Sequence, residues 1–173
     1  MKRPIFIAIA AVTIDGKIAR HKHHFSGWTS REDKNFLHKM LDSCDCVIVG
    51  NNTYKAAKKP LSRRNCIVLT SKVKSFSRIS KKLLYCNPTK TDMRMLIIKN
   101  DYRRIAILGG AQTYYYCLKH NMLDELYLTI EPIVFGKGIG LFLESSSLGT
   151  KFKLMSSKKL NKKGTILLIY KKI

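Results

Sequence analysis

The residue best suited to chemistry in this sequence is an acidic one, Asp33. It lies in a segment that opens at Thr29-Ser30 and has the 3.6-residue period of an amphipathic helix. The apolar residues that share a face with it are Phe36, Leu37, Met40 and Leu41. A carboxylate is costly to remove from water unless it has a partner, so this position indicates a role in binding or proton transfer. The alternative is a local role, because Ser30-x-x-Asp33 also has the spacing of a helix capping box.

A glycine pair, Gly109-Gly110, is the second candidate. It follows residues 105–108 (IAIL), an apolar run that is typical of a strand buried on both faces, and a helix is expected from near Ala111. Glycine lets the backbone come close to a ligand, and the free N–H groups of a helix start attract an anion. The pattern therefore indicates an anion-binding turn or, alternatively, a tight turn that binds nothing.

The elements that must position these residues alternate between strands and helices. Residues 45–50 (DCVIVG) form a strand that also ends in glycine, and the Asn and Thr side chains of 51–53 suit a helix start. Residues 66–70 (CIVLT) form a third buried strand, with Ser71 and Lys72 beyond it. Repeated strand-to-helix units predict a three-layer α/β domain with a mostly parallel sheet and a ligand across the strand ends. We expect residues 1–173 to form one such domain.

The remaining segments complete this sheet. Further strands are expected at residues 4–12, 83–86 and 125–131, and a further helix at 89–99. Residues 17–27 and 72–82 are expected to be polar loops. Residues 151–160 and 165–171 are expected to close the chain as an antiparallel hairpin, which makes the sheet mixed. The sequence has no G-x-G-x-x-G after its first strand and no G-x-x-x-x-G-K-[ST], which disfavours a Rossmann dinucleotide fold and a P-loop.

The composition is strongly basic. Lys and Arg number 33 against 11 Asp and Glu, and the resulting formal charge of +22 attracts polyphosphates, polycarboxylates and nucleic acid. The lysines are spread along the whole chain, which favours a solvated basic surface over a dedicated nucleic-acid stripe. The five cysteines include no CxxC pair and are expected to be free thiols. HKHH at 21–24 has no second ligand cluster, so no metal site is expected.

The hydropathy of the chain bears on its location. No apolar run approaches the ~20 residues that a membrane helix requires, so no membrane span is expected. The apolar run after Met1 leads into charged residues without a small-residue cleavage site, unlike a signal peptide. We therefore expect a cytoplasmic location.

Six segments occur in the order and approximate spacing of a known family. They are IDGKIA at 14–19, Trp28 followed by TSREDKNF, VIVGNNTY at 47–54, PLSRRNCIVLTS at 60–71, ILGGAQTY at 107–114 and LYLTIE at 126–131. Together they resemble the dihydrofolate reductase superfamily over nearly the full chain. The resemblance implies a dihydrofolate reductase-like fold and an NADPH-dependent oxidoreductase that acts on dihydrofolate, in tetrahydrofolate biosynthesis and one-carbon metabolism.

The resemblance implies that NADPH lies along the strand ends. Gly109 and Gly110 match the family's Gly-Gly, usually joined by a cis peptide bond, and the residues after them offer amides to the pyrophosphate. Asn51 stands where the family often has arginine, so the discrimination between NADPH and NADH depends on Lys72 and neighbouring basic residues. The residues that the resemblance assigns to the cofactor are Ala10, Ala11, Ile18, Gly50, Asn51, Asn52, Thr53, Thr70, Ser71, Lys72, Gly109, Gly110, Ala111, Gln112, Thr113 and Tyr114.

The resemblance also implies the catalytic residues, which are Asp33, Trp28 and Thr129. Asp33, five residues after Trp28, stands where dihydrofolate reductases have their single pocket carboxylate, and Thr129 is similar to the threonine that bonds to this acid. The carboxylate would anchor N3 and the 2-amino group of the pterin while hydride reaches C6 and a proton reaches N5. Arg64 is similar to the arginine that pairs with the glutamate carboxylate of folate, although surface charge is an alternative. The substrate pocket would also include Phe36, Leu37 and Leu61.

Two other functions are considered. The riboflavin-pathway 5-amino-6-(5-phosphoribosylamino)uracil reductase belongs to the same superfamily, and Ser26-Gly27-Trp28 is similar to its members. Those members use additional arginines for the ribose phosphate, one of them in the helix after the tryptophan, where this chain has Leu41 and Asp42. The acid at Asp33 favours a pterin. A non-catalytic nucleic-acid-binding protein on the same scaffold is supported by charge alone and lacks the aromatic platform that such binding uses. The sequence leaves monomer and homodimer open.

Overall fold

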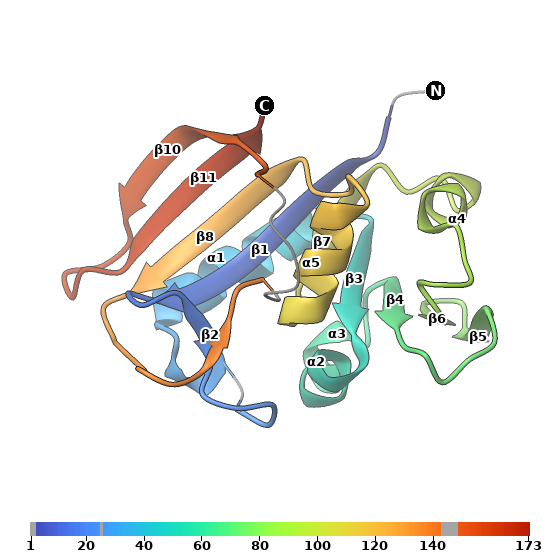
Figure 1. Cartoon of the computed structure of the whole chain (residues 1–173), viewed down its shortest axis with the longest axis horizontal. Helices are drawn as coiled ribbons and strands as arrows, with labels where there is room; N and C mark the ends of the chain where they lie inside the picture. The colour runs from blue at the N-terminus through green and yellow to red at the C-terminus, as the bar shows by residue number, and fades with distance from the viewer. Residues whose placement is uncertain (1–2, 25, 143–148) are drawn as a thin grey trace.

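The first apolar strand, β1 (Ile5–Thr13), lies in the middle of the sheet (Figure 1). The protein is described here by a computed structural model over residues 3–24, 26–142 and 149–173. Over these residues the main sheet has nine strands, which in sheet order are β10 (Phe152–Lys159), β11 (Ile166–Lys172), β8 (Glu125–Glu131), β1, β7 (Arg104–Ile107), β3 (Cys46–Gly50), β4 (Cys66–Leu69), β6 (Leu83–Cys86) and β5 (Phe76–Ser80). The pairs from β8 to β6 are parallel, and β5, β10 and β11 pair antiparallel. The predicted mixed sheet and its closing hairpin are confirmed.

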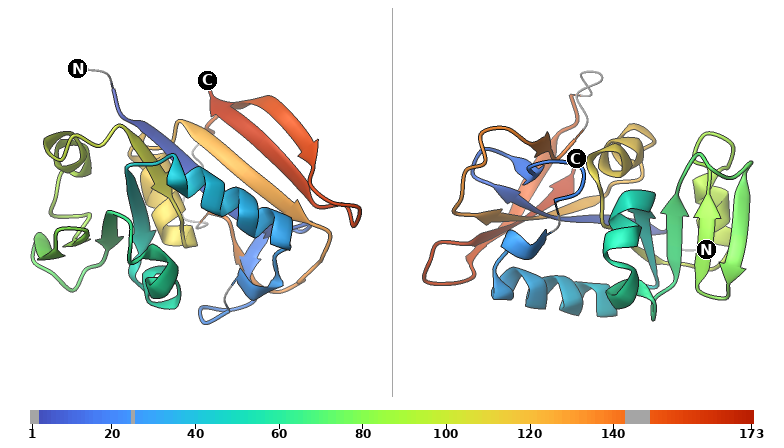
Figure 2. Two further views of the ribbon diagram at one scale, coloured as in Figure 1. Left: turned by 180° about the vertical axis from the view of Figure 1, so that it is seen from behind. Right: turned by 90° about the horizontal axis from the view of Figure 1, so that it is seen from below.

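Helices cover both faces of this sheet (Figure 2). The helices on one face are α1 (Arg31–Asp42), α2 (Asn51–Ala56) and α3 (Lys58–Leu61). The opposite face carries α4 (Met93–Lys99) and α5 (Ala111–Lys119). Each set of helices closes its own apolar core against the strands, which explains why β1 and β3 are apolar at successive positions. The three-layer architecture predicted from the sequence is therefore confirmed.

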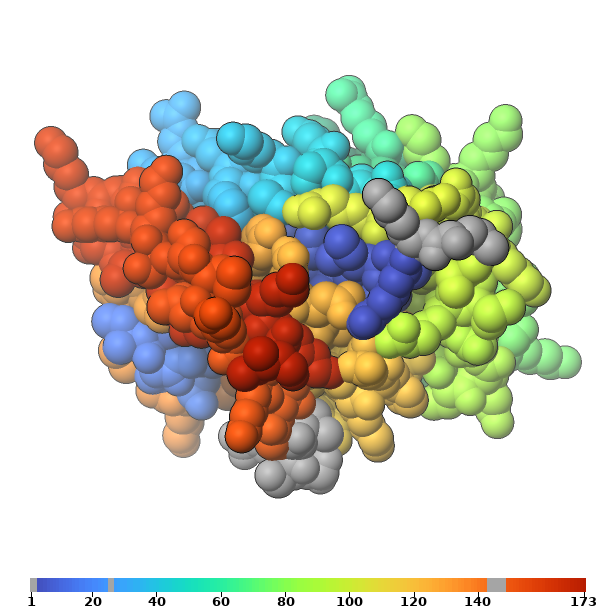
Figure 3. Space-filling model, turned by 90° about the horizontal axis from the view of Figure 1, so that it is seen from above, coloured from blue at the N-terminus to red at the C-terminus, as the bar shows by residue number. Residues whose placement is uncertain are grey.

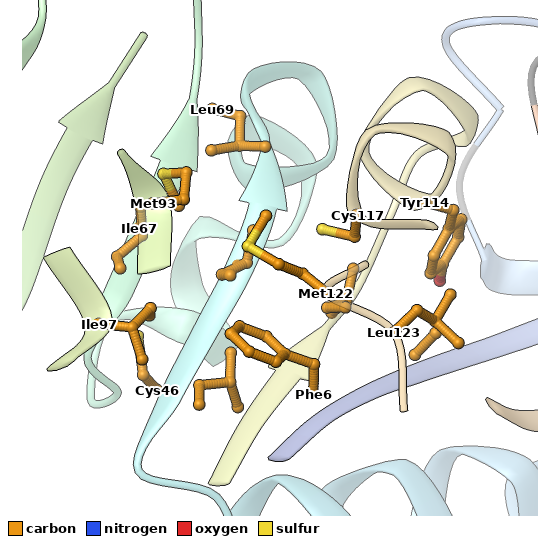
Figure 4. Close-up of a cluster of buried hydrophobic side chains, with 14 of the residues drawn as sticks. Phe6, Cys46, Ile67, Leu69, Met93, Ile97, Tyr114, Cys117, Met122 and Leu123 are labelled. Carbon is orange, nitrogen blue, oxygen red and sulfur yellow. The ribbon is translucent and has the colours of Figure 1, made fainter. Parts of the chain in front are cut away.

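The core beneath α4 and α5 is assembled from segments far apart in the sequence (Figure 4). Phe6 of β1, Ile97 of α4 and Cys117 of α5 are all fully buried in it. Met122 and Leu123, in the turn between α5 and β8, complete this layer. Because α5 is fixed on the sheet by these contacts, the position of its first turn over the strand ends is also fixed.

Several boundaries differ from the sequence prediction. Residues 72–82, expected as a loop, contain β5, because antiparallel pairing with β6 overrides the weak strand propensity of its serines. Helix α4 begins at Met93 rather than at residue 89, because the Asp92 side chain caps it. The expected polar loop at 17–27 contains β2 (Lys17–Ala19), which pairs with β9 (Ile139–Gly140), and a 3-10 turn, η1 (Ser26–Trp28).

The amino ends of the central strands form the face shown in Figure 3, where the start of β1 and the end of β11 lie near each other. All five cysteines are free thiols. In the part of the chain that the structure describes, no helix is long and apolar enough to cross a bilayer, and no cluster of His, Cys, Asp and Glu is suited to a metal ion. The single-domain assignment stays a prediction.

Candidate active site

Asp33 is buried although it belongs to the first turn of α1. Its exposed fraction is 7%, and its backbone N–H donates to the Oγ of Ser30, the residue that caps the helix. The hydroxyls of Thr129 and Thr29 donate hydrogen bonds to the Asp33 carboxylate. Burial raises the pKa of this carboxyl above its usual value, whereas the two hydroxyls act in the opposite direction. The backbone of Asp33 therefore takes part in the helix cap, while its side chain is a buried, partnered carboxylate.

Three glycines form a second feature at the carboxyl ends of the parallel strands. Gly109 and Gly110 are joined by a cis peptide bond, and the carbonyl of Gly109 accepts a 2.7 Å hydrogen bond from the N–H of Gly50. A Cβ atom on Gly109 would lie 2.6 Å from the ring of Tyr114, and one on Gly50 would lie 2.8 Å from the Oγ1 of Thr113. Side chains at these positions would collide with their neighbours, so glycine is required for the strand ends to approach this closely.

This glycine cluster fits a phosphate-bearing cofactor. Helices α2 and α5 begin directly after Gly50 and Gly110, and no side chain caps either helix start. The first N–H groups of a helix have no intrahelical partner and carry a partial positive charge, which suits a pyrophosphate. The Thr53 Oγ1 lies only 3.7 Å from the position of a Cβ on Gly110, so a polar side chain borders the same space. The residues present therefore suit the anionic part of a dinucleotide.

Tyr114 connects the glycine bend to the acid. Its ring packs against Gly109, and its buried hydroxyl donates a 2.6 Å hydrogen bond to the carbonyl of Ile9 in β1. Burial raises the pKa of this phenol, and the charge of Asp33 contributes to the shift. In the strand register Ala11 lies opposite Thr129, so β1 runs between the acid and the bend. Tyr114 therefore contacts the glycine bend and also interacts with the charge of Asp33.

The other residues that the sequence assigned to the cofactor lie at or near this edge. Gly50 is in register with Leu69, which places Thr70, Ser71 and Lys72 beside the start of α2. The N–H of Lys72 donates to the Oγ1 of Thr70, and the Lys72 side chain is exposed. The remaining assigned residues lie on β1, on β2 and in the first turns of α2 and α5, and they are Ala10, Ala11, Ile18, Asn51, Asn52, Ala111 and Gln112.

Of the residues assigned to the substrate, Leu61 is buried in the core and Arg64 already has an ion-pair partner. Leu61 is only 2% exposed and packs in the core beneath α3. The guanidinium of Arg64 forms a 2.6 Å ion pair with Asp42, at the amino end of β4. A cavity of about 180 Å³ lies at that end, lined in part by Arg63, Arg64 and Lys82. Phe36 and Leu37 are half-buried on α1, on the same helix as Asp33.

Two side chains in this region were not predicted as site residues. Glu131, at the end of β8, is 5% exposed, and its charge acts on Asp33. The two-residue period of strands puts it on the same face as Thr129, a signal that was present in the sequence. The ring of Phe135 packs edge-on against Trp28, with centroids 5.0 Å apart, and no sequence pattern marked it. Among the described residues the buried Nε1 of Trp28 has no hydrogen-bond partner.

Comparisons with known proteins identify the family and the fold. A model of the family described as dihydrofolate reductase matches residues 5–161. The uncharacterized protein YwjB of Bacillus subtilis is 28% identical over 166 residues, which are 91% of this chain and 92% of YwjB.

Two solved structures share the fold. One is a diaminohydroxyphosphoribosylaminopyrimidine deaminase/5-amino-6-(5-phosphoribosylamino)uracil reductase of Thermotoga maritima, with a TM-score of 0.76, 19% identity and coverage of 99% of this chain and 57% of that one. The other is a dihydrofolate reductase of Enterococcus faecalis complexed with NADP(H), with a TM-score of 0.70, 19% identity and coverage of 97% and 96%. The fold is thus that of the dihydrofolate reductase-like reductases, and with the family match over residues 5–161 this chain belongs to the dihydrofolate reductase family.

Proposed function

We propose that this protein reduces 7,8-dihydrofolate to 5,6,7,8-tetrahydrofolate with NADPH. The observation that carries the proposal is the buried carboxylate of Asp33, held by two threonine hydroxyls at the strand edge that also carries the glycine bend. A pterin presents a ring N–H and an exocyclic amino group side by side, and a carboxylate accepts both in a two-bond contact. A neutral residue at position 33 would not form this pair.

The chain's residues have separate tasks in the proposed reaction. NADPH, when bound, supplies the hydride that reaches C6 of the pterin. Asp33 binds N3 and the 2-amino group, and its negative charge favours the arrival of a proton at N5. Thr129 and Thr29 hold the carboxylate in place, since both hydroxyls donate to it.

The cofactor is assigned from the same edge of the sheet. The backbone N–H groups of Ala111 and Gln112, in the uncapped first turn of α5, would bind the pyrophosphate. Lys72 and Ser71, which follow β4 at the same edge, would bind the 2′-phosphate. The net charge of +22 raises the local concentration of such a polyanion. A related protein of the same fold was solved with NADP(H), which supports this assignment.

A second candidate is the riboflavin-pathway reduction of 5-amino-6-(5-phosphoribosylamino)uracil. It is favoured by the fold likeness to the Thermotoga maritima deaminase/reductase. The ion pair between Arg64 and Asp42 also favours it, because an arginine already paired is less available to the glutamate carboxylate of folate. The acid at Asp33 remains the argument for the pterin.

The test is a spectrophotometric assay of NADPH oxidation at 340 nm with each substrate in turn. Oxidation with dihydrofolate, abolished in Asp33→Asn, supports the primary proposal. Oxidation only with the phosphoribosylamino-uracil assigns the chain to the second candidate. If neither substrate oxidises NADPH while the cofactor binds, both assignments are wrong.

A further inference from the structure

Glu131 is a second carboxylate whose charge acts on Asp33. Its Oε1 accepts a 2.7 Å hydrogen bond from the N–H of Ser30, the residue that caps α1. Its Oε2 accepts a 2.7 Å hydrogen bond from the hydroxyl of Thr165. Both oxygens are therefore engaged, in short bonds, by groups from two different elements. This arrangement fixes the direction of the side chain inside the protein.

The contacts of Glu131 continue into the turn between β10 and β11. The Thr165 N–H donates to the Oδ1 of Asn161, and the Nδ2 of Asn161 donates to the Oγ1 of Thr165. The same Nδ2 lies 3.2 Å from the Oε2 of Glu32, which is in the first turn of α1. The first turn of α1 is thus held at two points, by Glu131 at Ser30 and by Asn161 at Glu32. Asp33 is the next residue in that turn.

The charges around Asp33 determine how its surroundings affect the pKa of its carboxyl. Glu131, from β8, raises the pKa of Asp33, and Lys34, its neighbour on α1, lowers it. From α5, Tyr114 is the titratable group that interacts with Asp33. Glu131 is the one negative charge in this set. Its removal would leave the hydroxyl partners of Asp33 in place and would take away a repulsion.

We propose that Glu131 is a positioning residue for Asp33, which holds the first turn of α1 against β8 and the closing hairpin and keeps a second negative charge beside the acid. This inference rests on the proposed function, in which Asp33 binds the substrate ring. It adds a structural role that does not depend on the substrate. Through Thr165 and Asn161, the C-terminal hairpin helps to position Asp33, which lies early in the chain. The hairpin is therefore part of the site's support.

Two variants separate charge from geometry. Glu131→Gln keeps the shape and an oxygen for the Ser30 N–H but removes the charge, and we expect the pKa of Asp33, followed by carboxyl NMR in the protein without ligands, to fall. Thr165→Val keeps the charge but removes the link to the hairpin, and we expect hydrogen exchange at the Ser30 amide to accelerate roughly tenfold, as the weakening of one charge-assisted hydrogen bond allows. Thr165→Ser, which keeps the hydroxyl, should restore slow exchange.

The matched control is Glu125→Gln, which removes the same charge from the same strand. Glu125 lies at the other end of β8, where its carboxylate accepts from the hydroxyl of Tyr127. This variant should leave the Asp33 titration and the Ser30 exchange unchanged. An Asp33 titration that is the same in Glu131→Gln and in the parent protein, or Ser30 exchange that stays slow in Thr165→Val, overturns the proposal. Neither measurement uses a substrate, so both can still be interpreted if the protein does not reduce dihydrofolate.

Discussion

The substitution Gly109→Ala tests how tightly the glycine bend is packed. Gly109 has φ +85°, a left-handed conformation that costs a residue with a Cβ ~1–2 kcal/mol. The added Cβ would lie 2.6 Å and 2.9 Å from two ring carbons of Tyr114, well inside van der Waals contact. The ring cannot move freely, because Tyr114 is 4% exposed and its hydroxyl is bonded to Ile9. Overpacking of this kind costs ~1–3 kcal/mol, so the free energy of unfolding should fall by about 2–5 kcal/mol in total.

Two companion variants isolate the steric part of this loss. Gly136→Ala places a Cβ at a similar φ, +70°, with no heavy atom within 4 Å, so it should lose only the ~1–2 kcal/mol of the conformational cost. Tyr114→Leu removes the colliding ring atoms, and Gly109→Ala in that background should lose no more than Gly136→Ala does. Urea unfolding at pH 7 gives each value by linear extrapolation. If Gly109→Ala and Gly136→Ala lose the same free energy in the presence of Tyr114, the close packing beneath the bend has been misjudged.

Three further predictions concern the acid and the basic surface. Asp33→Asn should reduce turnover of dihydrofolate at least ~100-fold in the 340 nm assay while the Kd for NADPH stays the same, and near-normal turnover would remove Asp33 from the mechanism. The same variant should be more stable than the parent protein at pH 7: because the pKa of Asp33 is raised in the folded protein, its ionisation destabilises the fold as the pH rises above about 4, and the difference should shrink in urea unfolding at more acidic pH. A variant that is less stable at pH 7 contradicts this burial argument. The affinity for NADPH should fall steeply between ~50 mM and ~500 mM NaCl if the basic surface contributes, and a flat response in a fluorescence titration would show that the charge of +22 is incidental.

The sequence was most informative where a residue type conflicts with its local pattern. An acid on the apolar face of α1 and paired glycines after a buried strand both pointed to the edge of the sheet where the structure places them. The three layers followed from apolar runs separated by helical segments, because strands buried on both faces have no polar alternation. Local signals were enough for these features.

Features that depend on tertiary contacts were less accessible. The pairing of β5 with β6 is decided by a partner strand and not by its own serine-rich sequence. The ion pair of Arg64 with Asp42 joins residues that no motif connects, so only the folded chain shows that this arginine already has a partner. Glu131 shares a period with Thr129, but its two bonds, to Ser30 and Thr165, depend on elements about 100 residues before it and about 30 residues after it.

The central place of β1 has a consequence during synthesis. Its two neighbours are β7 and β8, which pair with it in parallel and follow it by roughly a hundred residues. At ~5–20 residues per second, roughly 5–20 s pass between the synthesis of β1 and that of either neighbour. During that time the apolar run IFIAIAAV lacks both of its native partner strands and can associate with other molecules. Translation itself therefore sets the earliest moment at which β7 and β8 can pair with β1.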